Sequence, residues 1–313
     1  MNKEVSRDAR RARSPFTGAE SNRIWGWSAG RPIFQCPDTG AVFLNRDDLR
    51  GEDYQDYYFY LPSFTRKRFE WELQIRRRKF ERQLKLMSRY APGRRLLDVG
   101  AGPGYLVRMA LHLGWDARGV EISEEAVRHG RKVFGVEYVP LQDVADQSLD
   151  VITCYHVLEH IPEPAPFLDL LNRKLKPGGL LAFHVPHRQP FTFAIRSALR
   201  RLRGRTETMA SIYEDIHITG FTRDSLQRFV ERHGFGTHFT RTVGMWSAFY
   251  DPFFLGNYVR DRAWVPMVRK FLRHVIETTG IPFGFGDVVV GYFRKLPGEV
   301  PPEGSGSGAV APE

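Results

Sequence analysis

The stretch Leu96-Leu97-Asp98-Val99-Gly100-Ala101-Gly102-Pro103-Gly104 joins a short apolar run directly to three glycines at alternate positions. The apolar run predicts a buried strand, and the residues from Tyr105 to Leu113 predict a helix immediately after the glycines. Glycines in such a strand-to-helix turn let the backbone approach a ligand where a β-carbon would clash. The stretch therefore predicts a ligand-binding turn inside an α/β unit.

Two features of this turn separate the ligands that it could bind. Its spacing is Gly-x-Gly-x-Gly, without the third glycine of the dinucleotide pattern Gly-x-Gly-x-x-Gly. Asp98 ends the strand, and its carboxylate would repel a pyrophosphate but suits a ligand with an ammonium and a sulfonium. The turn therefore favours S-adenosylmethionine over a nicotinamide dinucleotide; a tight turn without any ligand is the alternative.

Glu121 ends the next predicted strand, 17 residues after Gly104. A carboxylate at this place accepts hydrogen bonds from ribose hydroxyls. Glu121 thus predicts an adenosine ligand but does not distinguish S-adenosylmethionine from a nicotinamide dinucleotide.

The chain around the turn alternates short apolar runs with helical segments, which is typical of βαβ units and a parallel sheet. Further strands are predicted at 117–122, 136–139, 149–154, 180–185 and 287–293, and further helices at 166–175 and 222–233. Ser123 is a predicted N-cap for a helix from Glu124, and Thr222 for the helix that follows it.

Four regions are predicted along the chain. They are an irregular N-terminal region at 1–62, a linking helix at 63–92, an α/β domain at 93–296 and a disordered tail at 297–313. Residues 187–220 interrupt the α/β domain and predict a lid or a substrate-binding insertion. The linking helix carries one apolar stripe, made of Phe69, Leu73, Phe80, Leu84 and Met87.

The composition sets limits on partners and location. The net charge is +10, clumped at 7–13, 66–82 and 196–205, which predicts solvated faces rather than a nucleic-acid interface. The two cysteines form no disulfide framework, and no run is apolar enough for a bilayer span, so a cytoplasmic protein is expected. Residues 245–276 interleave aromatic and basic side chains, which suits either peripheral membrane contact or a pocket wall or dimer surface.

Four segments in order, 96–104, 119–122, 149–161 and 175–181, resemble the motifs of class I S-adenosylmethionine-dependent methyltransferases. Together with 217–222, Leu226 and 234–235, they are most similar to the branch that methylates small molecules, quinones, sugars and lipids. The resemblance covers about residues 93–295. It implies a Rossmann-like sheet of seven strands, six parallel and one antiparallel, with helices on both faces.

The resemblance also implies a cofactor site. It places Gly100, Gly102 and Gly104 along the cofactor and Glu121 on its ribose. The remaining expected cofactor residues are Asp98, Ala101, Ile122, Tyr155 and Asp143. Asp143 is the nearest counterpart of the family's adenine-contacting acid, because the segment 140–148 is short.

Catalytic candidates lie where predicted strands end, since ligands bind there in open α/β sheets. Tyr155 and His156 follow the fourth strand, His184 and His187 flank the end of the fifth, and His217 closes the insertion. We predict His156, His217 and Tyr155 as catalytic, with His156 or His217 as a general base. The alternative for each histidine is a structural role, which is also the interpretation of the Glu159–His160 pair.

The N-terminal region resembles a small zinc ribbon. The four ligand positions of such a ribbon are Ser14, Thr17, Cys36 and Thr39. A structural zinc site needs four strong ligands, and one thiolate does not supply them. We therefore expect a ribbon-like fold remnant and predict no metal.

The predicted activity is methyl transfer from S-adenosylmethionine to a small-molecule, lipid-linked or glycan-related acceptor by in-line displacement. Three alternatives stay open at this point: a nicotinamide oxidoreductase, a non-catalytic protein that binds the cofactor, and an RNA methyltransferase suggested by the basic clumps.

Overall fold

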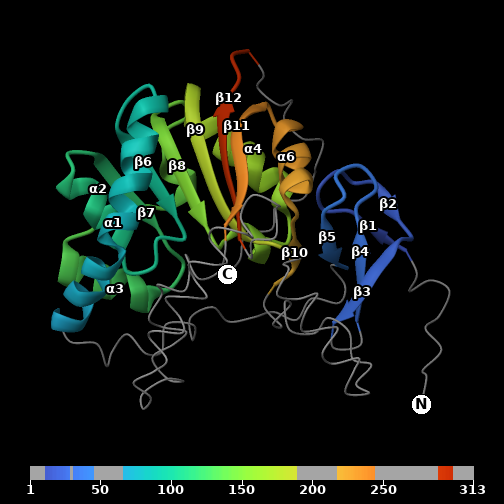
Figure 1. The fold of residues 1–313 in the computed structure, drawn as a ribbon, viewed down its shortest axis with the longest axis horizontal. Helices are drawn as coiled ribbons and strands as arrows, with labels where there is room; N and C mark the ends of the chain where they lie inside the picture. The colour runs from blue at the N-terminus through green and yellow to red at the C-terminus, as the bar shows by residue number, and fades with distance from the viewer. Residues whose placement is uncertain (1–10, 29–30, 46–65, 189–216, 244–287, 299–313) are drawn as a thin grey trace, which may run out of the picture.

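The computed structural model of the chain describes residues 11–28, 31–45, 66–188, 217–243 and 288–298 (Figure 1). Three predicted features lie outside the described residues: the basic clump at 196–205, the aromatic and basic segment at 245–276, and nearly all of the tail. Of the insertion at 187–220, the structure describes only its two ends.

The main sheet has six strands in the described part of the chain. Their order is β11 (Phe235–Val243), β12 (Val288–Lys295), β9 (Leu175–Pro186), β8 (Leu149–Tyr155), β6 (Arg95–Val99) and β7 (Asp116–Val120). The pairs β9–β8, β8–β6 and β6–β7 are parallel, whereas β12 is antiparallel to both of its neighbours. The mostly parallel α/β sheet is therefore confirmed.

The seventh strand position holds a single parallel bridge between Tyr138 and Gly119 rather than the strand predicted at 136–139. The chain enters the short helix η5 (Leu141–Asp143) directly after Pro140, so the pairing with β7 does not extend. The element at 235–243, which the sequence did not mark individually, is the half-buried strand β11. The predicted strand at 180–185 begins earlier, because Lys176–Gly179 belongs to β9.

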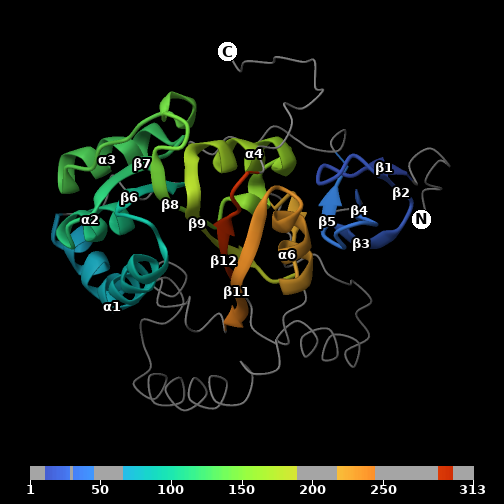
Figure 2. The same ribbon diagram turned by 90° about the horizontal axis from the view of Figure 1, so that it is seen from above.

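Helices cover both faces of this sheet (Figure 2). One buried cluster joins β6 residue Leu96 to α1 (Arg66–Tyr90), α2 (Tyr105–His112) and α3 (Glu124–Phe134). The other joins Leu97 to α4 (Pro164–Lys174) and α6 (Arg223–Glu231). Because successive strand residues point to opposite faces, the adjacent leucines of β6 enter different cores.

The linking helix is α1. Phe69, Phe80, Leu84 and Met87 of its predicted stripe are buried, and Leu73 is partly buried. Its arginines form i,i+4 ion pairs along the helix, such as Arg66 with Glu70 and Arg77 with Glu81. This part of the basic charge is thus a solvated helix face. The predicted caps at Ser123 and Thr222 are both present.

The N-terminal region forms a small β-structure, which we call the ribbon (residues 11–28 and 31–45). It contains β1 (Ala12–Arg13), β2 (Glu20–Ser21), β3 (Ile24–Ser28), β4 (Arg31–Gln35) and β5 (Val42–Leu44). A strand from the α/β domain, β10 (Thr219–Gly220), completes its sheet beside β5 (Figure 1). The ring of Phe16 packs 5.1 Å from Phe229 and 5.6 Å from Phe221, so the ribbon shares a core with the main sheet.

Candidate functional site

The glycine turn after β6 has no β-carbon at three of its five positions. Gly100, Gly102 and Gly104 have φ of 74°, 54° and 81°, in the left-handed region that glycine adopts without strain. A β-carbon on Gly104 would lie 2.8 Å from Val136 Cγ2 and 2.9 Å from Tyr138 Oη. Tyr138 also donates a hydrogen bond of 2.9 Å to the Gly102 carbonyl. Nothing in the sequence pattern indicated this support from Tyr138, because it depends on a contact between distant segments.

Glu121 holds the same turn from the neighbouring strand β7. Its carboxylate accepts hydrogen bonds from Gly102 N at 2.7 Å and from Ile122 N and Ser123 N at 2.9 Å each. The side chain of Ile122 is 65% exposed. An acceptor group and an apolar side chain therefore lie together beside the turn, as a ribose and an adjoining base would require.

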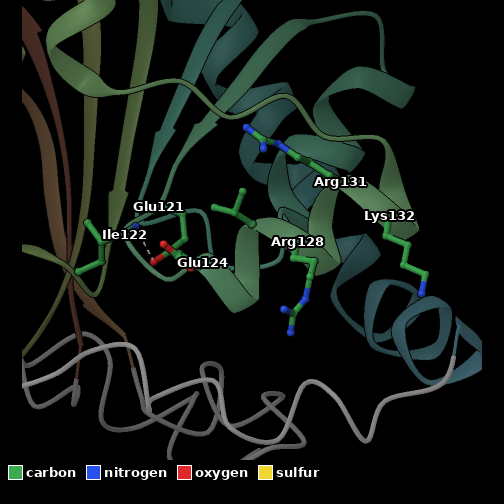
Figure 3. A pocket seen from close by; sticks show the side chains of 7 residues that line it. Glu121, Ile122, Glu124, Arg128, Arg131 and Lys132 are labelled. Atoms are coloured by element: carbon green, nitrogen blue, oxygen red, sulfur yellow. Dashed lines mark hydrogen bonds between the residues drawn. The ribbon is translucent and has the colours of Figure 1, made fainter.

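A cavity of about 710 Å³ opens at this place (Figure 3). It is lined by Glu121, Ile122, Glu124, Val127, Arg128, Arg131 and Lys132. Asp143 is exposed in the short helix η5 (Leu141–Asp143) and is not among these residues. Its contact with adenine stays a prediction.

Asp98 lies at the end of β6, buried under the turn. Thr153 Oγ1 donates a hydrogen bond of 2.6 Å to Asp98 Oδ1. Burial raises the pKa of Asp98 to about 7; the Thr153 hydrogen bond opposes this shift and the charge of Glu121 adds to it. A cationic ligand nearby would favour the ionised form of this carboxyl.

Asp98→Asn is expected to stabilise the ligand-free protein, and to do so more at pH 8 than at pH 5. Because the folded-state pKa of about 7 exceeds the ordinary value of 3.8, the folded protein binds this proton more tightly than the unfolded chain. The free energy of unfolding therefore falls as pH rises from about 4 to about 7 in the wild type. Denaturant unfolding at the two pH values measures it; an equal stability difference at both would contradict a buried, titrating Asp98.

Two aromatic rings form a wall at the end of β8. Tyr155 stacks on His184 with ring centroids 3.8 Å apart and planes at 13°. Burial raises the pKa of Tyr155 well above its ordinary value and lowers the pKa of His184 well below its own. At neutral pH the phenol thus keeps its proton and the imidazole is uncharged. This geometry suits positioning rather than proton abstraction, and the catalytic role of Tyr155 stays a prediction.

His156 follows Tyr155 in a backbone conformation that side chains rarely adopt. Its φ is 57°, and its N–H donates a hydrogen bond of 2.8 Å to the His184 carbonyl. Its ring Nδ1 lies 3.3 Å from Oε1 of Glu159, in the short helix η6 (Leu158–His160). Non-glycine residues held in this region are often functional. The contact with Glu159 leaves Nε2 as the ring nitrogen that can accept a proton.

Glu159 is the centre of a cluster of histidines. Its side chain is 2% exposed, and His160 Nε2 lies 4.0 Å from Oε1. The rings of His160 and His217 are 4.9 Å apart. Burial opposes ionisation of Glu159, yet the hydrogen bond from His156 and the charges of His156, His160 and His217 hold the pKa of its carboxyl below the ordinary value.

The structure thus brings together His156 and His217, which the sequence predicted, around Glu159, which it treated as structural. Potential ligand atoms of Glu159, His160 and His217 lie within 4.8 Å of one another, a spacing at which they could hold a cation together. A glutamate that lies between two histidines just after a strand end was the available signal.

The four ribbon positions predicted from the zinc-ribbon resemblance also meet. Thr17 Oγ1 lies 3.6 Å from Cys36 Sγ. Burial disfavours the thiolate, but hydrogen bonds from Ser14, Thr39 and Thr17 keep the pKa of Cys36 below its ordinary value. Three hydroxyl groups therefore surround the sulfur where a zinc ribbon would have strong ligands, and the relation to zinc ribbons stays a prediction.

Comparison with known proteins gives a consistent picture. A family profile described as "Methyltransferase domain" matches residues 71–238. The ubiquinone biosynthesis O-methyltransferase of Acinetobacter baumannii (strain AYE) is 33% identical over 124 residues, 36% of this chain and 52% of the relative. That of Bordetella avium is 36% identical over 123 residues, 36% of this chain and 51% of the relative. The chain spans about half the length of these relatives.

Among solved structures, a SAM-dependent methyltransferase from Archaeoglobus fulgidus matches with a TM-score of 0.45 and 16% identity. The match covers 78% of this chain and all of the other.

Proposed function

The chain belongs to the methyltransferase domain family, whose profile covers more than half of it, and we propose that it transfers a methyl group from S-adenosylmethionine to a hydroxyl of a small molecule. One observation carries the proposal. The glycine turn with Glu121 and the His156–Glu159 pair follow the carboxyl ends of the parallel strands β6, β7 and β8. That edge of an open α/β sheet is where ligands bind.

The residues beside the turn fit S-adenosylmethionine. Glu121 would accept from the ribose hydroxyls, Ile122 would contact the adenine, and the turn from Gly100 to Gly104 would follow the methionine part. Asp98 adds a buried carboxyl that a positively charged ligand would ionise. S-adenosylmethionine supplies a methyl group activated by a positively charged sulfur.

His156 is the proposed general base. Its Nε2 takes the proton of the acceptor hydroxyl, while Nδ1 lies 3.3 Å from Oε1 of Glu159, whose negative charge stabilises the imidazolium that forms. Glu159 also fixes the tautomer, because Nδ1 must carry the hydrogen in that contact. The stacked rings of Tyr155 and His184 would form one apolar wall beside this histidine.

A phenolic hydroxyl is the proposed acceptor. The relatives named for O-methylation in ubiquinone biosynthesis support oxygen as the methylated atom. Their match covers 36% of this chain, so the acceptor identity rests on chemistry: a general base serves a hydroxyl better than an already nucleophilic amine. The alternatives of an RNA methyltransferase and of a non-catalytic protein have no comparable support.

The cytoplasmic location and the peripheral membrane contact that the sequence suggested belong to the same proposal. Among the described residues, no helix is both long enough and apolar enough to span a bilayer. The segment that suggested peripheral membrane contact, 245–276, lies outside them.

Calorimetry and a transfer assay test this function. We expect S-adenosylhomocysteine to bind and NADH not to bind, because carboxylates beside the glycine turn would repel the pyrophosphate of NADH. Tritium from methyl-labelled S-adenosylmethionine should then appear on a catechol probe, with total RNA and a hexose as comparison acceptors. Binding of NADH alone would overturn the cofactor, and labelling of RNA alone would overturn the acceptor class.

A further inference from the structure

The C-terminal end of the insertion forms main-chain hydrogen bonds with the ribbon. We call residues 217–220 the strap. Leu44 N donates a hydrogen bond of 2.9 Å to the Ile218 carbonyl, and Thr219 and Gly220 pair with Phe43 and Val42 of β5. The strap is therefore the edge strand of the ribbon sheet, although it belongs to the α/β domain in sequence.

The opposite side of the strap forms hydrogen bonds with Leu158 and Glu159, in the segment that carries the histidine cluster. Ile218 N donates a hydrogen bond of 2.8 Å to the Glu159 carbonyl. Thr219 Oγ1, which is buried, donates one of 3.1 Å to the Leu158 carbonyl. A single residue, Ile218, thus connects the ribbon to the segment that carries the buried carboxylate.

The ribbon has its own attachment to the α/β domain, so it can act as a fixed support. Phe16 packs against Phe221 and Phe229, and Arg228 Nε on α6 donates a hydrogen bond of 3.0 Å to the Thr39 carbonyl. The strap has only a two-residue strand of its own. Because so short a strand has little intrinsic stability, its position depends on the partners on both sides.

We propose that the ribbon is the positioning element for His217. By pairing with the strap it fixes the residue beside Glu159 and His160, and thereby completes the side of the site that faces the acceptor. Leu44 and Thr219 act through His217 and are positioning residues. The proposal rests on the proposed function for its kinetic part, but the placement of His217 is independent of it.

Leu44→Pro tests the link from the ribbon, because it removes the N–H that bonds to Ile218. Leu44→Ala is its matched control, since it loses the same packing but keeps the donor. Thr219→Val removes the hydroxyl bond from the other side with nearly unchanged shape, and it serves if Leu44→Pro does not fold. All are made in the full chain, with binding of S-adenosylhomocysteine measured by calorimetry as the check on the cofactor site.

The first readout is the Cε1–Hε1 NMR signal of His217, assigned with His217→Asn. We expect it to move in Leu44→Pro and in Thr219→Val but not in Leu44→Ala, with cofactor-product binding unchanged in all three. An unmoved signal in both Leu44→Pro and Thr219→Val would overturn the proposal, whether or not methyl transfer is found.

The second readout is kcat with the catechol probe. A displaced group costs about 10- to 100-fold in rate, so Leu44→Pro and Thr219→Val should each lose that much, but should lose nothing further in a His217→Asn background. If the loss in rate from each variant instead multiplied with that of His217→Asn, the ribbon would only support the fold. Absence of transfer by the wild type would count against the proposed function and would leave the NMR result to decide on positioning.

Discussion

Replacing His156 by asparagine is expected to lower kcat by about 10²–10⁴-fold, the usual contribution of a general base. Asparagine is the matched replacement because it tolerates the left-handed backbone, and φ at this residue is 57°. The variant should therefore keep the turn and lose only the imidazole. Initial rates of tritium transfer to the catechol probe measure the effect, with calorimetry to show that S-adenosylhomocysteine still binds.

Glu159→Gln is the companion variant. It keeps the shape of the buried side chain but removes the charge that lies 3.3 Å from His156 Nδ1. Since the imidazolium then loses its partner, kcat should fall, by less than in His156→Asn, and the double variant should fall no further than His156→Asn alone. A rate in His156→Asn within a few-fold of the wild type would rule out His156 as the base.

Removing the carboxylate of Glu121 is expected to weaken cofactor binding by about 10²-fold or more. Two hydrogen bonds from hydroxyls to a charged acceptor contribute about 1.5–3 kcal/mol each, and about 1.4 kcal/mol corresponds to tenfold in affinity. Glu121→Ala should also loosen the turn, because Gly102 N loses its acceptor at 2.7 Å. Glu121→Gln, which keeps one acceptor oxygen, should fall between Glu121→Ala and the wild type.

Glu137→Gln is the control for charge. Glu137 is exposed, pairs with Arg118 at 3.4 Å and does not line the cavity, and its loss changes the net charge by the same amount. Calorimetric titration with S-adenosylhomocysteine should give equal affinities for Glu137→Gln and the wild type. Equal affinities for Glu121→Ala and the wild type would show that the ribose is held elsewhere.

The glycine turn and Glu121, the half of the candidate site proposed for the cofactor, could be predicted as neighbours because their arrangement is local. The turn from Gly100 to Gly104 and Glu121 lie on two consecutive strand ends, so a spacing in the sequence becomes a spacing in space. Tyr138 escaped prediction since its hydrogen bond to Gly102 spans 36 residues. Asp143 was predicted by analogy alone, and its contact with adenine stays a prediction.

The catalytic half was only partly predictable. A strand end marked His156, and the motif order marked His217, but neither pattern indicated that both would face one carboxylate. Glu159 is buried, and its carbonyl accepts a hydrogen bond from Ile218 N of the strap, 59 residues away, a contact that local periodicity does not record.

By itself, the sequence determined the glycine turn and the caps at Ser123 and Thr222, since each depends on residues a few positions apart, and the α/β class and the family, since these depend on several such local patterns in order. Only the tertiary structure decided that one strand position shrinks to the bridge at Tyr138, and that the ribbon shares the core and its sheet with β10. It also decided that Glu159 gathers the histidines. These outcomes depend on which distant surfaces bury one another. The free energy of burial is non-directional, so it produces no regular spacing in the sequence from which such contacts could be predicted.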